Sequence, residues 1–274
     1  MRLGIFARTF ARDTLEAALD AVVAHGLDAA QFNPVLLGGP SLPPSLSAAD
    51  RERVAAAHGA RGIAMVAVSG TYNMAHPDPV RRADGARRLA ALIAAAPGLG
   101  TGVVTLCAGT RDPDDMWRAH PGNAAPDAWA DMLASVTAAV EAAERAGVAV
   151  AVEPEPGNVV RDAPAARRLL DQVRSPALRI VLDAANLLPP ERLPDQARVL
   201  GEALELLGPA LVLAHAKDVR PDGTVVAAGR GAVDYPAYVA GLRSAGFDGP
   251  LVLHGLAEDE VDASVAFVRA ALTA

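Results

Sequence analysis

Short apolar runs alternate with longer Ala-rich segments along the whole chain. The apolar runs are uninterrupted and are expected to form strands, at residues 3–7, 28–32, 63–69, 103–107, 148–153, 178–183, 211–215 and 251–254. The segments after them carry apolar residues at helical spacing, at residues 13–25, 47–59, 79–96, 126–146, 163–173, 194–207, 235–245 and 258–272. In the fourth helix Met132, Val136 and Val140 lie on one stripe, and Gly147 follows its end.

The uninterrupted strands indicate how the sheet is built. A run such as Val-Ala-Val-Ala-Val at residues 148–152 has no polar face, so both faces of the strand are expected to be buried. Buried strands that alternate with helices form parallel sheets, and eight strand–helix units predict a (β/α)8 TIM barrel of the α/β class. We expect a single TIM-barrel domain over residues 1–274, and a doubly wound open sheet is the alternative.

Composition narrows the class of protein further. Apolar residues make up 51% of the 274 residues and charged residues 21%, which excludes a disordered chain. The net charge of −7 disfavours a nucleic-acid partner, and no apolar run approaches the roughly 18 residues of a membrane span. The first residues are interpreted as a strand and not as a signal peptide. The single cysteine, Cys107, excludes an intrachain disulfide and favours a cytoplasmic location.

Four consecutive strands end in residues that bind metals. In a TIM barrel the carboxyl ends of the strands form the active face, and strands five to eight end in Glu153, Asp183, His215 and His254. One such residue alone is usually a solvated loop residue, but four at matching positions predict a shared site. Carboxylate and imidazole ligands suit a divalent ion such as Mn²⁺, Zn²⁺, Co²⁺ or Mg²⁺ rather than Ca²⁺, and its identity stays open.

Other polar residues follow the strand ends and are expected to bind substrate. They are Gln31, Asn73, His76, Arg111, Trp117, Asn186, Lys217 and Arg230. Arg230 lies between two glycines after the seventh strand, where TIM barrels often bind phosphate, although such an Arg is also common in plain loops. Glu155 lies two residues beyond Glu153, and two close carboxylates raise one pKa, which suits acid–base catalysis. The alternative for Glu155 is a salt bridge at the barrel mouth.

Four short runs together resemble a known family. They are residues 70–78 (GTYNMAHPD), 153–155 (EPE), 183–187 (DAANL) and 215–218 (HAKD). The set resembles the sugar phosphate isomerase/epimerase family of xylose isomerase-like TIM barrels, over the whole chain. The resemblance implies a metal held by Glu, Asp, His and Glu from strands five to eight. Glu153, Asp183 and His215 match the first three ligands. His254 stands in place of the last Glu, and Asn186 stands where many epimerases have a substrate-contacting His.

The resemblance and the strand-end residues favour a divalent-metal-dependent isomerase or epimerase of a small keto-sugar, polyol or sugar phosphate. Glu153 or Glu155 would abstract a proton next to a carbonyl, and the metal would stabilise the enediolate. Isomerisation can use one base. Epimerisation at C3 needs a second proton carrier on the opposite face, a role that falls to His254 in the absence of the family's Glu. The sequence leaves the oligomeric state open, with a homo-oligomer among the options.

Four other functions stay open at this stage. A dehydratase would use the same enediolate and expel a neighbouring hydroxyl, and a barrel without the strand-eight Glu could bind a sugar without turning it over. Phosphodiester hydrolysis, as in the endonuclease IV branch, needs metal ligands on the early strands, where the second strand offers only Gln31 and Asn33. Lys217, the only lysine, could form a Schiff base, although its neighbour Asp218 favours a charged, ion-paired lysine.

Overall fold

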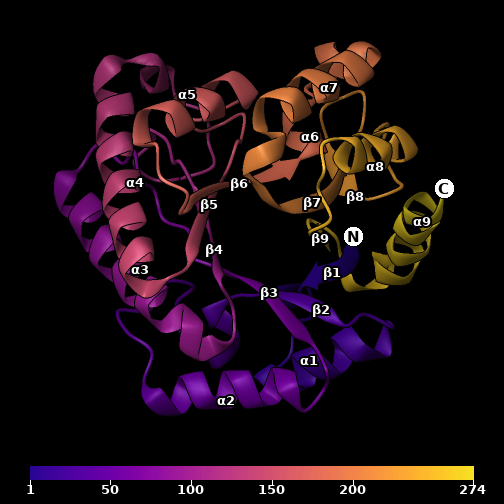
Figure 1. Ribbon diagram of the computed structural model, residues 1–274, viewed down its shortest axis with the longest axis horizontal. Coiled ribbons are helices and arrows are strands. Elements are labelled where there is room, and N and C mark those ends of the chain that lie inside the picture. The colour runs from indigo at the N-terminus through magenta and orange to yellow at the C-terminus, as the bar shows by residue number, and fades with distance from the viewer.

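The computed structural model describes residues 1–274 and contains a closed barrel of eight parallel strands (Figure 1). The barrel strands are β1 (Arg2–Phe6), β2 (Ala29–Phe32), β3 (Ala64–Ser69), β4 (Val103–Cys107), β5 (Ala149–Glu153), β6 (Leu178–Asp183), β7 (Leu211–Val219) and β9 (Pro250–Leu253). Consecutive strands pair from β1 to β7, and β9 pairs with both β7 and β1, so the ring is complete. The expected (β/α)8 barrel is therefore confirmed.

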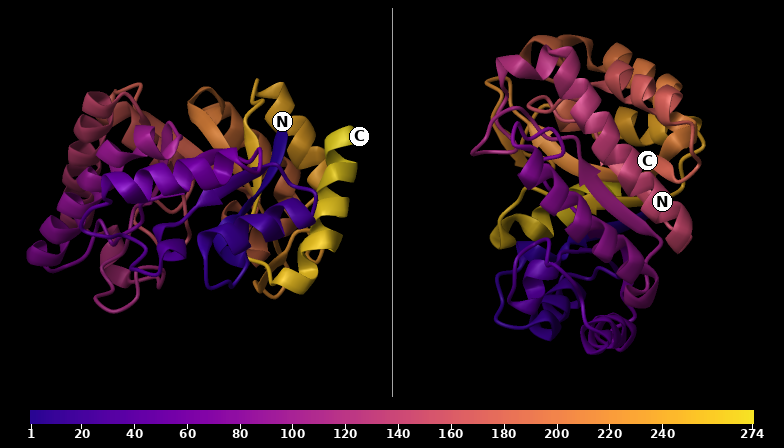
Figure 2. Two further views of the ribbon diagram at one scale, coloured as in Figure 1. Left: turned by 90° about the horizontal axis from the view of Figure 1, so that it is seen from below. Right: turned by 90° about the vertical axis from the view of Figure 1, so that its left-hand side faces the viewer.

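Helices surround the barrel in every view (Figures 1 and 2). They are α1 (Leu15–Ala24), α2 (Ala48–Gly59), α3 (Pro79–Leu99), α4 (Pro126–Ala146), α5 (Ala163–Val173), α6 (Ala184–Leu187), α7 (Gln196–Leu207), α8 (Tyr235–Ser244) and α9 (Val261–Thr273). Short 3-10 helices lie in the connections: η1 (Ala7–Thr9), η2 (Pro34–Leu37), η3 (Pro121–Ala124), η4 (Pro190–Asp195), η5 (Gly208–Ala210) and η6 (Glu258–Glu260). None of the helices combines the length and the apolar character needed to cross a membrane.

Strand β7 is longer than the sequence pattern indicates. The apolar run ends at His215, but the strand continues to Val219 and turns back into β8 (Val225–Ala227), which pairs with it in antiparallel fashion. Asp218 stabilises this extension, because its carboxylate accepts hydrogen bonds from the backbone N–H groups of Val219, Gly229 and Val233. The hydrophobic pattern did not predict this extension, because Lys217 and Asp218 are polar.

Helix α3 also runs past its expected end at Ala96. Pro97 lies inside the last turn, where its missing N–H removes a single intrahelical hydrogen bond. The helix then ends at Leu99, whose side chain is buried in the core. Gly100 follows with a φ of 94°, and the N–H of Thr101 bonds to the carbonyl of Ala96, which satisfies the helix end. The burial of Leu99 thus outweighs the loss of one intrahelical hydrogen bond at Pro97.

The barrel interior holds a small apolar core directly beneath the site. Its buried members come from six strands: Phe6, Ala67, Ala151, Val181, Leu213 and Val252. Side chains two residues apart on a strand point to the same face, so the residues two positions after Ala151, Val181, Leu213 and Val252 point into the same interior. These residues are Glu153, Asp183, His215 and His254. A much larger apolar cluster fills the layer between the strands and the helices.

Candidate functional site

Glu153, Asp183 and His215 converge at the carboxyl ends of β5, β6 and β7. Each offers one ligand atom, and these three atoms lie within 4.8 Å of one another. All three residues are buried, with exposed fractions of 8%, 1% and 2%. Their register explains the convergence, because Asp183 pairs directly with His215 across the β6–β7 ladder. The sequence pattern therefore identified three residues that the fold does bring together.

A chain of hydrogen bonds fixes the orientation of the His215 ring. The Nε2 atom lies 3.0 Å from the Oε1 atom of Gln31, while the Nε2 atom of Gln31 donates to the hydroxyl of Thr105 at 3.0 Å. Because Gln31 thus presents its carbonyl oxygen, the Nε2 atom of His215 carries the hydrogen. In the neutral ring the Nδ1 atom is then left with a lone pair that faces the carboxylates.

Two buried polar atoms at the centre of the site lack a hydrogen-bond partner. They are the Nδ1 atom of His215 and the Oδ2 atom of Asp183. The Nδ1 atom lies 3.1 Å from the Oε2 atom of Glu153 and 3.9 Å from that Oδ2 atom, without hydrogen-bond geometry. Lone pairs at such distances repel unless a positive charge lies among them, and the ammonium group of Lys217 supplies one at the Oδ2 atom of Asp183. Two carboxylate oxygens and one imidazole nitrogen form a donor set that fits a divalent ion such as Zn²⁺ or Mn²⁺.

Lys217 places a cation of the protein itself against the same carboxylates. Its Nζ atom lies 3.0 Å from the Oδ2 atom of Asp183 and 3.8 Å from the Oε1 atom of Glu153. Burial disfavours the charge on Lys217, but the carboxylates of Asp183 and Glu153 outweigh burial and raise its pKa. Burial would likewise raise the pKa of Glu153, yet His215 and Lys217 overcome it and lower that pKa. Lys217 is therefore positively charged and Glu153 is negatively charged.

Asn186 links these charged groups to each other. It donates from Nδ2 to the Oε1 atom of Glu153 at 2.8 Å, and its Oδ1 atom accepts a hydrogen bond from Lys217 at 3.1 Å. The sequence predicted Asn186 and Lys217 as substrate contacts. The structure shows both side chains holding the carboxylates of the candidate metal centre, so they orient the ligands from one side as Gln31 does from the other.

His254 follows β9 and lies beside the three ligands without joining their set. Its ring stacks on Phe6 with centroids 4.9 Å apart, and it meets the His215 ring edge-on at 5.1 Å. The group of converging ligand atoms contains Glu153, Asp183 and His215 only. Burial lowers the pKa of His254 far below its usual value, and the proximity of His215 and Lys217 adds to the effect. The ring is therefore a neutral imidazole at the wall of the site.

Glu155 lies at the same mouth and makes no ion pair within salt-bridge distance. The structure gives it no hydrogen bond through its carboxyl group, although its backbone N–H bonds to the carbonyl of Val160 at 3.0 Å. Burial raises the pKa of Glu155 well above its usual value, and the charge of Glu153 raises it further. At neutral pH this carboxyl group is therefore protonated and can donate a hydrogen. The result differs from the salt bridge that the sequence left as an alternative.

A cavity of about 170 Å³ lies above these residues. Seven residues singled out in the sequence line it, namely Gln31, Trp117, Glu153, Glu155, His215, Lys217 and His254. Trp117 is 47% exposed and forms part of the rim. The cavity is also lined by six residues to which the sequence assigned no role, namely Phe6, Arg8, Ser69, Thr71, Thr105 and Leu106. Larger hollows elsewhere contain none of the three converging ligands, so the chemistry belongs to this small cavity.

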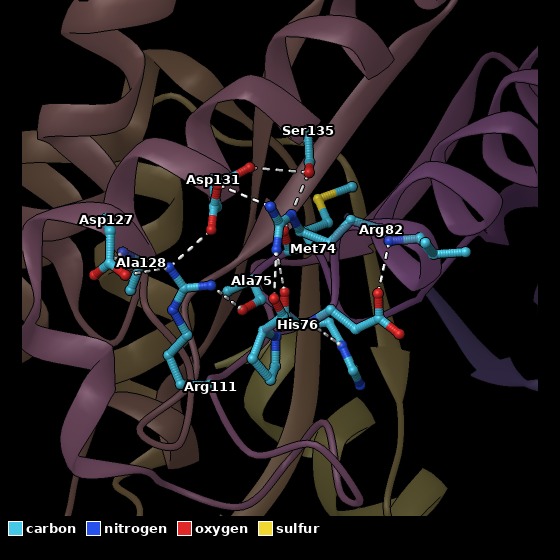
Figure 3. A network of polar contacts seen from close by, with 12 residues as sticks. Met74, Ala75, His76, Arg82, Arg111, Asp127, Ala128, Asp131 and Ser135 are labelled. Atoms are coloured by element: carbon cyan, nitrogen blue, oxygen red, sulfur yellow. Dashed lines mark hydrogen bonds and ion pairs between the residues drawn. The ribbon is translucent and has the colours of Figure 1, made fainter.

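Asn73, His76 and Arg111 lie outside this cavity and connect two loops instead. Figure 3 shows His76 and Arg111 within this network of polar contacts. The guanidinium of Arg111 pairs with Asp131 at 2.8 Å and donates to the carbonyl oxygen of Ala75 at 3.1 Å. The Oδ1 atom of Asn73 accepts from the N–H of Thr110 at 2.9 Å, and the Nε2 atom of His76 lies 3.1 Å from the carbonyl oxygen of Pro113. These contacts fasten the loop after β3 to the loop after β4.

Arg230 also lies away from the cavity, on the exposed surface after β8. The glycines beside it have a structural explanation. A Cβ atom on Gly231 would lie 2.3 Å from the Oδ1 atom of Asp218, and Gly229 has a φ of 87°. Both glycines therefore let the loop wrap around the Asp218 carboxylate.

Comparison with known proteins agrees with this geometry. A family model described as the xylose isomerase-like TIM barrel matches residues 19–271. The chain belongs to this family. No curated protein sequence matches it.

Several solved structures share this xylose isomerase-like barrel. One is the apo form of the 3-keto-D-glucoside 4-epimerase YcjR from E. coli, with 19% identity, a TM-score of 0.79, and coverage of 98% of this chain and 99% of that one. Another is the D-psicose 3-epimerase from Clostridium cellulolyticum H10 with D-tagatose, with 17% identity, a TM-score of 0.76 and coverage of 99% of both chains. A third is the IolI protein with a bound zinc atom, with 17% identity, a TM-score of 0.74, and coverage of 100% of this chain and 98% of that one. At these identities the likeness establishes the fold.

Proposed function

We propose that this xylose isomerase-like barrel is a divalent-metal-dependent isomerase or epimerase of a small keto-sugar, polyol or sugar phosphate. One observation carries the proposal. The Nδ1 atom of His215 is buried without a hydrogen-bond partner beside the carboxylates of Glu153 and Asp183, and Glu153 and His215 line the cavity. Lys217 already pairs with the Oδ2 atom of Asp183, but a buried lone pair on Nδ1 without a donor is costly unless it binds a cation. The structures of a 3-keto-glucoside epimerase and a psicose epimerase with the same fold support a sugar as the substrate.

Glu153, Asp183 and His215 would hold the ion. When bound, a divalent ion supplies Lewis acidity, which lowers the cost of negative charge on a carbonyl oxygen next to it. The protein contributes the proton transfers. Glu153 is ionised and is placed to accept a proton from the carbon beside the carbonyl, while Glu155 is protonated and can donate a hydrogen to a substrate oxygen. Asn186 keeps the Oε1 atom of Glu153 fixed during this transfer.

His254 determines which reaction follows. It lines the cavity from β9, whereas Glu153 lines it from β5, and β6 and β7 lie between these strands in the barrel. A neutral imidazole at this wall can hold or release one proton on the face of the substrate away from Glu153. With that second carrier the site can epimerise, and without it the site can still isomerise a ketose with Glu153 alone.

The cavity rim suits a sugar ring. Trp117 is half exposed beside hydroxyl-bearing Thr71 and Ser69. A sugar presents one face of C–H groups that packs on an aromatic ring, and hydroxyls that bond to polar side chains. We assign Trp117 as the platform for the ring, and Gln31 as a residue whose main task is to orient His215.

Proton exchange provides a test that needs no knowledge of the product. The protein is loaded with Mn²⁺ or Zn²⁺ and incubated in D2O with D-tagatose, D-fructose and their 6-phosphates. Loss of the proton signal from the carbon beside the carbonyl is expected in at least one mixture. A metal-free sample and Glu153→Gln serve as controls, and both should leave the signal intact.

The same experiment separates the alternatives. A dehydratase would produce a dehydrated dicarbonyl compound that absorbs ultraviolet light, and Glu155 could protonate the departing hydroxyl. A barrel that only binds sugars would give no exchange while ligand still raises its melting temperature. Failure of exchange with every ketose would contradict the proposed proton abstraction.

A further inference from the structure

Arg8 lies at the mouth of the candidate site and has no charged partner. It belongs to η1, directly after β1, and its side chain is exposed. Its guanidinium lies 4.8 Å from the centroid of the Phe6 ring, an arrangement typical of a cation–π contact. This contact keeps the cation beside the cavity, where no carboxylate neutralises it.

The neighbouring Arg12 shows what an ordinary surface arginine in this region does. It donates to the carboxylate of Glu258 through both terminal nitrogens, with one of these bonds at 2.8 Å. That ion pair joins the loop after β1 to the loop after β9. Arg8 comes from the same loop and has no such role, so its charge is available to a ligand.

Arg8 also lies where two hollows meet. The site cavity of about 170 Å³ and an adjoining hollow of about 390 Å³ share Phe6, Arg8 and His254. The second hollow is completed by Thr9, Gly255, Leu256 and Ala257, none of which carries a charge. A substrate with its carbonyl near Glu153 can therefore extend past His254 and Phe6 until its far end reaches Arg8.

Among the Lys and Arg side chains, only Arg8 and Lys217 line these hollows. Lys217 is already engaged with Asp183, Glu153 and Asn186. One uncommitted guanidinium at the end of an otherwise uncharged hollow matches a single negative charge. A guanidinium binds the two oxygens of a carboxylate side by side, whereas phosphate sites gather several donors.

We infer that the substrate is a keto-sugar acid, whose terminal carboxylate is bound by Arg8 while its carbonyl end lies at Glu153, Asp183 and His215. The inference rests on the proposed function, because it assigns the far end of the same substrate. It makes Arg8 a specificity-determining residue: it contacts the substrate but takes no part in proton transfer.

Three probes test the charge of that end group. D-Tagatose, D-tagaturonate and D-tagatose 6-phosphate share the ketose and differ at the terminal carbon, which is an alcohol, a carboxylate or a phosphate ester. Each is titrated into the metal-loaded protein by calorimetry. We expect D-tagaturonate to bind about tenfold more tightly than D-tagatose, a difference of about 1.4 kcal/mol. The Arg8→Gln variant should lose that difference and keep the affinity for D-tagatose.

The matched control is Arg12→Gln, which removes an arginine from the same loop and should keep the preference for the carboxylate. Equal binding of D-tagatose and D-tagaturonate by the native protein would overturn the inference and leave the proposed function intact. A preference that survives in Arg8→Gln would overturn it too, since the metal would then be binding the carboxylate. Tighter binding of the phosphate would overturn the assignment of a carboxylate. Absence of binding by all three probes would contradict both this inference and the proposed function.

Discussion

The two halves of the barrel rim use the same kinds of residue for different purposes. The loops after β3 and β4 carry Asn73, His76 and Arg111, and the ends of β5 to β9 carry Asn186, His215 and Lys217. In the first half the side chains bond to backbone carbonyls and N–H groups of the neighbouring loop. In the second half Asn186 and Lys217 contact the carboxylates of Glu153 and Asp183, and the Nδ1 atom of His215 remains without a hydrogen-bond partner. The difference teaches that residue type alone marks neither half as functional, whereas the convergence of two carboxylates and an imidazole does.

The largest expected effect is the loss of activity in Glu153→Gln, which tests the half of the rim that we assign to catalysis. Glu153→Gln keeps the shape of the side chain but removes both a charged ligand and the proton acceptor. Proton exchange into a ketose should fall by at least about 100-fold, while the melting temperature changes little. NMR exchange rates and calorimetric melting curves measure the two quantities. Glu205→Gln, an exposed and unpaired position, is the control. Full exchange in Glu153→Gln would end the role of this residue.

The next effect tests the half that we assign to structure. Arg111→Met leaves the Asp131 carboxylate and the Ala75 carbonyl short of a donor at the junction of two loops. The free energy of unfolding should fall by about 2 kcal/mol, since an Arg side chain with little exposure loses charge-assisted hydrogen bonds. Denaturant titration measures this change. Activity per folded molecule should stay close to the native value, and a selective loss of activity would place Arg111 in the site after all.

A smaller effect concerns the cation that the protein itself supplies. Lys217→Met removes the ammonium group that lies 3.0 Å from Asp183, an oxygen that a metal would also use. Without metal, two buried carboxylates then lose their partner and the melting temperature should fall. The affinity for Mn²⁺ should rise about tenfold, because the ion no longer competes with Lys217. Calorimetric titration of the metal-free protein measures this affinity, and an unchanged or weaker affinity would contradict the competition.

The smallest effect concerns His254. His254→Glu places a carboxylate where the family has a Glu, and His254→Ala removes the ring altogether. The glutamate variant should bind Mn²⁺ a fewfold more tightly than the native protein, because it adds a charged oxygen near the ion. The alanine variant should bind the ion like the native protein if His254 serves as a proton carrier and not as a ligand. A large loss of affinity in His254→Ala would instead make it the fourth ligand.

Strand-end residues were the part of the site that could be predicted from sequence. Ala151 with Glu153, and Leu213 with His215, lie two residues apart on apolar strands, so burial of one residue fixes the direction of the other. The contacts of Asn73 with Asp112 and of His76 with Pro113 could not be predicted in this way. They join residues that are far apart in sequence and depend on how two loops meet. A signal for Arg111 was nonetheless present, because Asp127 and Asp131 are one helical turn apart.

Two features of the structure, the extension of β7 and the position of Arg8, could not be predicted from the hydrophobic pattern. The extension of β7 to Val219 begins at polar Lys217 and Asp218, where an apolar run ends. Arg8 follows β1 and offers no metal-binding atom, so the pattern of metal-binding residues at strand ends gives it no role. In both cases the deciding information is what surrounds the residue, namely the N–H groups around Asp218 and the uncharged hollow beside Arg8.

The pairing of β1 with β9 also has a consequence for synthesis of the chain. Arg2 pairs with Pro250 and Ile5 with Leu253, so the first strand finds its second neighbour only when the last strand has been made. Phe6 stacks on His254, and Arg12 bonds to Glu258, across the same seam. A nascent chain that lacks β9 therefore has an open sheet, and its site cavity lacks His254. Closure of the barrel and completion of the cavity both depend on β9.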